Sequence, residues 1–159
     1  MEMKIANQSK PAQCVMFALF TVVGAMVVAL PCRAQEHKAI NLSPQRGLPF
    51  SDGVIAGNTL YIAGQEGTDA SDKLVAGGIS AETAAALENI QKVLKAAGFE
   101  LKDIVSVTVY LADIHDFPEM NKVYKTVMPD PKPARATIQA AALVNNARVE
   151  ISAIAVMAK

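Results

Sequence analysis

The sequence predicts an α+β fold, in which a single sheet carries two helices packed on one of its faces. Segments that alternate apolar and polar residues surround two segments with helical spacing, in the order strand-strand-helix-strand-helix-strand-strand. A length of 159 residues, with abundant apolar residues, suits one domain with one core. No repeat, low-complexity tract or second domain interrupts the pattern.

The first 34 residues have the three parts of a secretory signal peptide. Two lysines lie among the first ten residues, an uncharged apolar run covers 14–31, and Ala34 is a small residue suited to precede a cut. We therefore expect export, to the periplasm, with cleavage after Ala34 and no membrane contact afterwards. An uncleaved anchor is the alternative, because the run approaches the length that spans a bilayer. A lipoprotein is disfavoured because Pro31 precedes Cys32.

Removal of this segment changes the composition of the chain. The 15 basic and 15 acidic residues become 12 and 14, because three basic residues and one acidic residue are lost. Both cysteines, Cys14 and Cys32, are lost as well, so the mature chain has neither a disulfide nor a thiol nucleophile. No basic stripe remains, and nucleic acid is therefore not expected as a partner.

The mature chain begins with a polar lead-in (35–48), in which a brief strand is expected over 39–42, and continues as a folded domain (49–159). Two short strands follow, at 54–55 and 60–63. Gly57 and Asn58 lie between them, and this pair is a strong signal for a two-residue hairpin turn. Residues 64–78 are rich in Gly, Asp and Ser and are expected to form a loop.

The first helix is expected to begin at Ser80, a good N-cap, and to end at Gly98, a natural C′ residue. A strand over 103–112 follows, with alternating faces. One face carries Val105, Val107, Val109 and Leu111. The second helix is expected to run from Asp116 to about residue 127, with proline in its first turn.

Two final strands are expected at 134–143 and 148–157. Asn145 and Asn146 supply the turn between them, because asparagine tolerates positive φ. We expect these strands to form a hairpin. The sheet then has one face covered by helices and one uncovered face rich in aliphatic residues, which indicates self-association.

Several classes of site are disfavoured by the residues themselves. His37 and His115 are the only histidines, and neither lies in a cluster with the spacing of metal ligands, so no metal is expected. A Gly-rich phosphate loop is absent, and two loop histidines do not support a Ser/His/Asp triad. His115 is interpreted as a surface loop residue.

Two charged residues on otherwise apolar strands remain as candidates. Arg135 opens a strand, where it acts either as a ligand clamp or in a surface ion pair. Glu150 lies between Val149 and Ile151, so its carboxylate faces either solvent or a cleft. Asn121 on the second helix passes for a capping or surface residue. The residue types alone leave these alternatives open.

Several ordered motifs resemble the RidA (YjgF) family. They are PARAT at 133–137 followed by Leu143, VEISAIAV at 149–156, LYIAGQ at 60–65, KAAG at 95–98, and DIHDF at 113–117 followed by Asn121. The resemblance extends from about residue 49 to 157 and leaves the signal peptide outside, so the domain 49–159 is similar to a RidA domain.

This resemblance implies a chorismate-mutase-like fold, a homotrimer with active sites between subunits, and hydrolysis of 2-imino or enamine acids to 2-keto acids and ammonia without metal or cofactor. Arg135 corresponds to the arginine that grips the substrate carboxylate, and Glu150 to the acid that holds the attacking water. Gly64, Asn121 and Phe50 correspond to residues of the pocket.

That assignment makes chemical sense. A planar guanidinium offers a carboxylate two parallel charged hydrogen bonds, and a carboxylate can relay a proton from water to the leaving nitrogen. Three positions depart from some members: Ala63 replaces a serine, Phe50 a tyrosine, and Thr137 a cysteine. These changes put substrate choice and rate in doubt more than the fold.

The expected hairpin gives a geometric prediction. Arg135 would lie opposite about residues 154–157, and Glu150 some five residues nearer the turn, roughly 15 Å away. The two residues would therefore meet only across a subunit interface. The alternative function is a non-catalytic trimer that binds small carboxylates or acts as a holdase; in that case Arg135 is only an anion site.

Overall fold

The computed structural model describes residues 36–43 and 47–158. The proposed signal peptide and its cleavage point lie outside the described residues. Within the described ranges, no helix has the length and apolar character needed to cross a membrane.

Six strands and two α-helices make up the described domain, joined by loops and three short 3₁₀ turns. In chain order the elements are β1 (His37–Ile40), β2 (Gly53–Ala56), β3 (Thr59–Glu66), α1 (Gly78–Ala97), η2 (Leu101–Asp103), β4 (Ile104–Leu111), η3 (Ile114–Asp116), α2 (Phe117–Val127), β5 (Ala134–Gln139), η4 (Val144–Asn146) and β6 (Val149–Val156).

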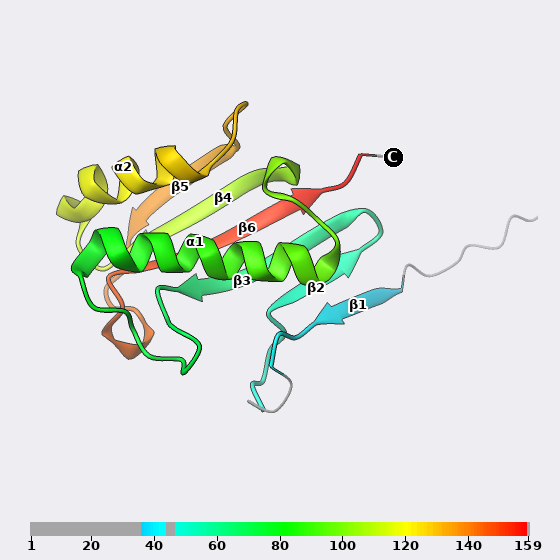
Figure 1. The fold of residues 1–159 in the computed structure, drawn as a ribbon, viewed down its shortest axis with the longest axis horizontal. Helices are drawn as coiled ribbons and strands as arrows, with labels where there is room; N and C mark the ends of the chain where they lie inside the picture. The colour runs from blue at the N-terminus through cyan, green and yellow to red at the C-terminus, as the bar shows by residue number, and fades with distance from the viewer. Residues whose placement is uncertain (1–35, 44–46, 159) are drawn as a thin grey trace, which may run out of the picture. The chain divides into compact units, whose positions relative to one another are not determined.

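The strands form one mixed sheet with the order β1-β2-β3-β6-β4-β5. Only β4 and β5 are parallel neighbours; the other described pairs are antiparallel. Both helices lie on the same face of the sheet (Figure 1). The predicted α+β architecture is therefore confirmed, and no helix of the described residues lies over the other face of the sheet. We refer to this as the open face.

The predicted hairpin between β2 and β3 is confirmed. Ala56 pairs with Thr59, and Gly57 adopts a φ of 63°, which a residue without Cβ reaches at no steric cost. However, β3 continues to Glu66 instead of ending at Ala63, so three further residues belong to the strand. This longer strand brings an additional acidic side chain into the sheet.

The predicted hairpin of the last two strands is wrong. β6 lies between β3 and β4, whereas β5 pairs in parallel with β4 at the edge of the sheet and ends at Gln139. Asn145 and Asn146 do adopt positive φ, 56° and 58°, but the turn that they form carries the chain from the edge to the centre. The physical reason is burial: every second residue of β6 is buried, and a central position pairs both of its edges.

The start of α1 differs from the prediction, whereas its end agrees with it. The helix begins at Gly78, so Ser80 lies inside it and is not the N-cap. Gly77 and Gly78 have φ values of 119° and 73°, and this left-handed backbone lets the chain turn into the helix two residues early. At the other end, Gly98 has a φ of 81° and its N–H donates to Leu94 O and Lys95 O, as predicted.

One residue of β4 was assigned to the wrong face. Val107, Val109 and Leu111 are buried against the helices as predicted, but Val105 is 48% exposed. The register between β4 and β6 shifts between Ile104 and Ser106. This irregularity reverses the direction in which Val105 points, and the alternation of apolar residues gives no sign of it.

The core lies between the sheet and the two helices, and Leu87 of α1 is fully buried in it. Leu87→Ala is expected to lower the free energy of unfolding by about 2–5 kcal/mol, through lost transfer energy and a residual cavity. Gln91→Ala, on the exposed side of the same helix, is the control and is expected to change it by less than about 0.5 kcal/mol. Denaturant titration at one protein concentration measures both. Equal effects would contradict the position of the core.

Candidate active site

A cavity of about 570 Å³ opens at the end of β3 and the start of β6, beside the loop that precedes β2. Four of the residues predicted to form the site line it: Phe50, Ala63, Gly64 and Glu150. The structure thus brings these four residues together from three separate segments of the chain. Their roles toward a substrate remain predictions.

Gly64 allows the Glu150 side chain to lie directly against β3. A Cβ atom on Gly64 would overlap Glu150 Oε1 and would lie 2.6 Å from its Cδ. The register between β3 and β6 shifts between Ile62 and Gln65, so Gly64 lies in a bulge of β3. The glycine is therefore required by close approach, because the space that its side chain would fill is taken by the carboxylate.

Gly64→Ala is expected to displace the Glu150 carboxylate and to lower kcat of the reaction proposed below by about a hundredfold. The fold is expected to survive, because the clash is with a flexible side chain and Gly64 has no left-handed φ. Steady-state kinetics and thermal melting of the variant check this. A variant with wild-type kcat would show that the position of the carboxylate does not matter.

The Glu150 carboxyl is partly withdrawn from water. Burial raises the pKa of Glu150, and the negative charge of Glu66 raises it further. The two residues are direct cross-strand partners in the register of β3 and β6. Glu66 in turn accepts a hydrogen bond from Asn145 Nδ2 at 3.1 Å. A carboxyl group with a raised pKa accepts a proton more readily than an ordinary glutamate, which suits it to proton transfer.

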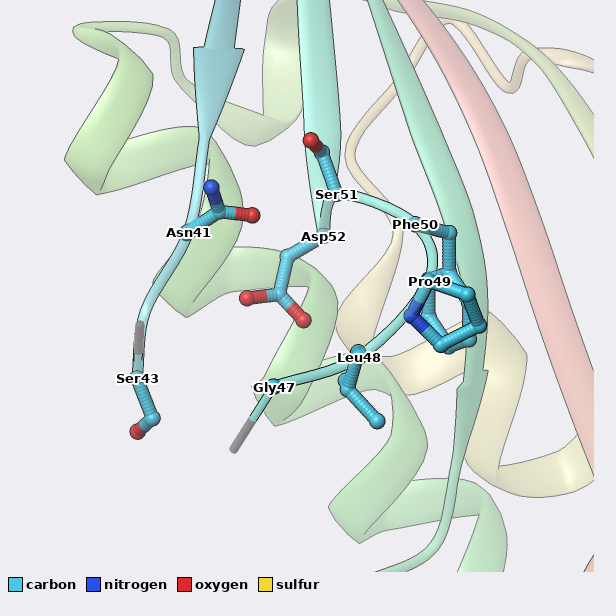
Figure 2. Close-up of a pocket in the computed structure, with 8 residues that line it drawn as sticks. All are labelled: Asn41, Ser43, Gly47, Leu48, Pro49, Phe50, Ser51 and Asp52. Atoms are coloured by element: carbon cyan, nitrogen blue, oxygen red, sulfur yellow. The ribbon is translucent and has the colours of Figure 1, made fainter. Parts of the chain in front are cut away.

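The loop before β2 places Phe50 at the rim of this cavity. Figure 2 shows the Asp52 carboxylate between the two arms of the loop, with Asn41 and Ser43 on one arm and Gly47 and Leu48 on the other. Asp52 is buried, and its Oδ2 accepts a hydrogen bond from Leu42 N at 2.7 Å.

Asp52 is therefore best explained as the group that holds this loop. Its backbone oxygen also accepts from Ala63 N at 3.0 Å, which ties the loop to β3. Phe50 remains 56% exposed. An aromatic ring left this open at the mouth of a cavity can contact a ligand or another protein surface.

Arg135 lies in a second group of residues, at the sheet edge beside α2. Its Nη2 donates to Asn121 Oδ1 at 2.8 Å, and its Cζ lies 4.4 Å from the ring centre of Tyr124 and 5.6 Å from that of Phe117. Two aromatic rings and one amide thus hold the guanidinium. Burial raises the pKa of Tyr124, and the nearby charge of Arg135 opposes this shift.

Thr137 is the last of the predicted site residues. It follows Arg135 by two positions on β5, and the two therefore point to the same side of the sheet. Its Oγ1 is buried and has no hydrogen-bond partner among the described residues. The predicted residues Asn121, Arg135 and Thr137 are thus neighbours, but they are separate from the cavity that holds Glu150.

The two groups lie on opposite faces of the sheet. Arg135 pairs with Val107, which is buried under the helices, so Arg135 points to the helix side. Glu150 lies between the buried residues Val149 and Ile151, so it points to the open face.

The distance between Arg135 and Glu150 also indicates that they do not share a substrate within one chain. Through the register, Arg135 is level with Ala153, three residues from Glu150 and two strands away. This corresponds to about 14 Å between Cα atoms. The predicted hairpin is wrong, but the observed register also separates Arg135 from Glu150 within one chain. One small substrate is therefore not expected to reach both side chains of the same chain.

An ion pair joins the residue before β6 to the residue before α2. Arg148 Nη2 donates to Asp116 Oδ1 at 2.8 Å, and its Nε donates to Asp116 Oδ2 at 3.0 Å. The backbone N–H of Arg148 donates to Glu82 Oε2 at 2.8 Å. These bonds fix the start of β6 to both helices, so Glu150, two residues later, has a defined position.

Three residues near the site were missed by the sequence analysis. Phe117 and Tyr124 flank Asn121 on α2 at i, i+4 and i+7 spacing, which places all three on one helix face. That spacing could have identified the aromatic support of Arg135. Glu66 was missed because β3 was predicted to end at Ala63, which left Glu66 in a loop.

No group of three His, Cys, Asp or Glu side chains suited to a metal ion occurs in residues 36–43 and 47–158. His115 is exposed at the start of α2, where its Nδ1 lies 2.7 Å from Asp113 Oδ1. This agrees with its interpretation as a surface loop residue. His37 is exposed at the start of β1 and does not line the cavity that holds Glu150.

The chain is similar to proteins of known sequence along most of the described domain. The family model described as Endoribonuclease L-PSP matches residues 41–157. The cattle protein named 2-iminobutanoate/2-iminopropanoate deaminase is 50% identical over 109 residues, which are 68% of this chain and 80% of the relative. The human protein of the same name is 45% identical with the same coverage.

Solved structures give the same result for the fold. The crystal structure of RidA from a Psychrobacter species has a TM-score of 0.68 and 34% identity, and covers 79% of this chain and 99% of that chain. The YjgF gene product of E. coli has a TM-score of 0.66 and 32% identity, and covers 69% and 89%. These are similarities of nearly whole domains.

Proposed function

The chain belongs to the Endoribonuclease L-PSP family, that of the RidA (YjgF) proteins, and we propose that it is an imine deaminase, which hydrolyses 2-imino and enamine acids to 2-keto acids and ammonia. The observation that carries this proposal is that the chain combines a guanidinium held for anion binding with a carboxyl group of raised pKa in a cavity. Relatives named as deaminases of such substrates are 45–50% identical to it.

The reaction requires a fixed substrate and a mobile proton. Arg135 binds the substrate carboxylate through two parallel charged hydrogen bonds, which presents the imine carbon to a water held by Glu150. Water forms a C–O bond to that carbon while the C=N electron pair moves to the nitrogen. The proton of the water passes to the Glu150 carboxylate.

The second half of the reaction returns this proton. Glu150 gives it to the amine nitrogen, the C–N bond breaks and ammonia leaves. The remaining hydroxyl group loses its proton to solvent as the C=O bond forms, which completes the keto acid and balances the proton that solvent gave to the imine nitrogen before the attack. No step needs a redox group, because the imine carbon is already electrophilic and positioning with proton transfer suffices.

The active unit is a homotrimer in this proposal, with Arg135 and Glu150 of one site supplied by different subunits. The support is geometric: within one chain the two side chains point to opposite faces of the sheet. Arg135 lies on β5, the edge strand, where another copy can approach it. The open face also carries exposed apolar side chains, Tyr61 at 50% and Ile138 at 49%, which a subunit contact would cover.

Export remains part of the proposal. The apolar run at 14–31 and the small residue Ala34 support a cleaved signal peptide and a periplasmic location. Expression of the full chain in a bacterium, followed by mass spectrometry of the periplasmic fraction, tests it. A product that begins at Gln35 is expected; a membrane-bound chain of full length would contradict it.

The proposed function is tested with the mature protein, residues 35–159. An amino-acid oxidase generates 2-imino acids in the presence of semicarbazide, and semicarbazone formation is followed by absorbance. The protein is expected to suppress semicarbazone formation because it removes the imine first. If it fails to do so across several imino acids, the deaminase proposal is wrong, and the fold serves in binding or as a holdase.

A further inference from the structure

The cavity that holds Glu150 contains more negative charge than one catalytic carboxylate requires. Its lining includes Glu66, Glu150, Asp52 and Asp72, and no lysine, arginine or histidine from the described ranges. Asp52 serves the loop before β2, as its hydrogen bond to Leu42 N shows. Asp72 has a φ of 57° in the loop after β3. The pair that faces the proposed chemistry is Glu66 with Glu150.

The close pairing of Glu66 and Glu150 lowers the stability of the folded protein. Glu66 and Glu150 are directly opposed on antiparallel strands, and like charges in that position destabilise a sheet. Glu150 also has Tyr110 as its partner on the other side, so no cation faces it from β4. Asn145 Nδ2 is the donor that holds Glu66 Oε2, at 3.1 Å. An amide satisfies a carboxylate oxygen but does not cancel its charge.

We propose that Glu66 is a second functional carboxylate of the site, which stabilises the positive charge that develops on the substrate nitrogen beside Glu150. This inference rests on the proposed function. A protonated imine, or iminium, is the form that water attacks, and the departing amine must also be protonated. A fixed negative charge beside the nitrogen favours both species over their neutral forms.

The reaction balance is unchanged by this role. Solvent supplies the proton that converts the imine into the iminium, and Glu66 itself neither gains nor loses a proton. Glu150 still accepts the proton of the attacking water and returns it to the nitrogen. Glu66 thus acts on the substrate nitrogen through its charge alone. The repulsion between Glu66 and Glu150 is tolerated because a cation is bound beside them in each turnover.

The pH dependence follows from the same contact. Ionised Glu150 is the active form, so activity is lost as the pH falls through the pKa of Glu150. The charge of Glu66 raises that pKa. Removal of the Glu66 charge therefore moves the acidic limb of the pH–rate profile to lower pH. The carboxyl groups of Asp52 and Asp72 line the same cavity, and Tyr110 is the cross-strand partner of Glu150 on β4. The substitution leaves these three groups unchanged.

Glu66→Gln is the test, because glutamine keeps the shape and still accepts from Asn145. We expect kcat/KM for 2-iminopropanoate to fall about tenfold, the acidic limb to move to lower pH, and the melting temperature without substrate to rise. Glu88→Gln is the control: it removes an exposed carboxylate of α1 that pairs with Lys92. It is expected to change none of the three.

The outcomes separate the two proposals. A wild-type protein that hydrolyses no imine overturns the proposed function and the catalytic role of Glu66 with it. An active wild type whose Glu66→Gln variant keeps full kcat/KM overturns this inference alone. A variant that melts lower and loses activity with an unmoved acidic limb also overturns it, because that result describes a structural residue.

Discussion

Arg135→Ala is expected to lower kcat/KM for 2-iminopropanoate by about 10²–10³-fold. The substitution removes both charged hydrogen bonds to the substrate carboxylate, and loss of one partner of a desolvated charged pair costs about 2–5 kcal/mol. Asn121 and the ring of Tyr124 hold the guanidinium in place in the wild type. Water that fills the space left by the alanine variant would not reproduce its charge or its fixed orientation. The coupled semicarbazone assay over a range of substrate concentrations measures the effect.

Arg135→Lys is the matched comparison. Lysine keeps the positive charge but lacks the planar fork, so we expect activity between those of the alanine variant and the wild type. Thermal melting of both variants verifies that the sheet edge remains folded. If the alanine variant retained wild-type kcat/KM, Arg135 would not be the carboxylate clamp.

Glu150→Gln is expected to lower kcat by about 10²–10⁴-fold, with little change in KM. Glutamine has the shape of glutamate and fits the space left by Gly64, but it cannot accept the proton of the attacking water. The prediction therefore separates proton transfer from packing. The variant is expected to melt at a higher temperature, because burial and Glu66 both disfavour the charged carboxylate.

The pH profile of the wild type provides a further check on Glu150. Its raised pKa means that ionised, active carboxylate is lost at a higher pH than for an ordinary glutamate. We expect kcat to fall with decreasing pH and Glu150→Gln to abolish this limb. A limb that persists in the variant would assign the ionisation to another group.

Turns and helix ends that depend only on neighbouring residues are predicted correctly by the sequence. Gly57, Asn58 and Gly98 act within a few residues, and the turns and helix end that they predict are present. The start of α2 after Asp116 is equally local. These features depend on backbone conformations that a short segment specifies by itself.

The errors concern partners that lie far apart in the chain. β5 and β6 are consecutive, so a hairpin was the simplest pairing, yet β6 inserts between β3 and β4. Insertion buries alternate residues of β6 and uses both of its edges, a gain that appears only when the whole sheet is considered. The irregular register at Val105 and the continuation of β3 to Glu66 also depend on pairing with β6, which is distant in the sequence.

In the candidate site, too, single residues could be identified from the sequence, but contacts between distant strands could not. Arg135 and Glu150 were found as charges within apolar strands, and the resemblance supplied their roles. The close approach at Gly64 and the cross-strand pairing of Glu66 with Glu150 depend on register, which the sequence pattern does not determine. The support of Arg135 by Phe117 and Tyr124 was readable from helical spacing and was overlooked.

The central claim is that Arg135 of one chain works with Glu150 of another. Mixing Arg135→Ala with Glu150→Gln, after joint unfolding and refolding, tests it most directly. In randomly mixed trimers, about a quarter of the sites receive both intact residues, so we predict about 25% of wild-type activity from two inactive proteins. Activity that stays at the level of the separate variants would show that each site belongs to a single chain and would contradict the account.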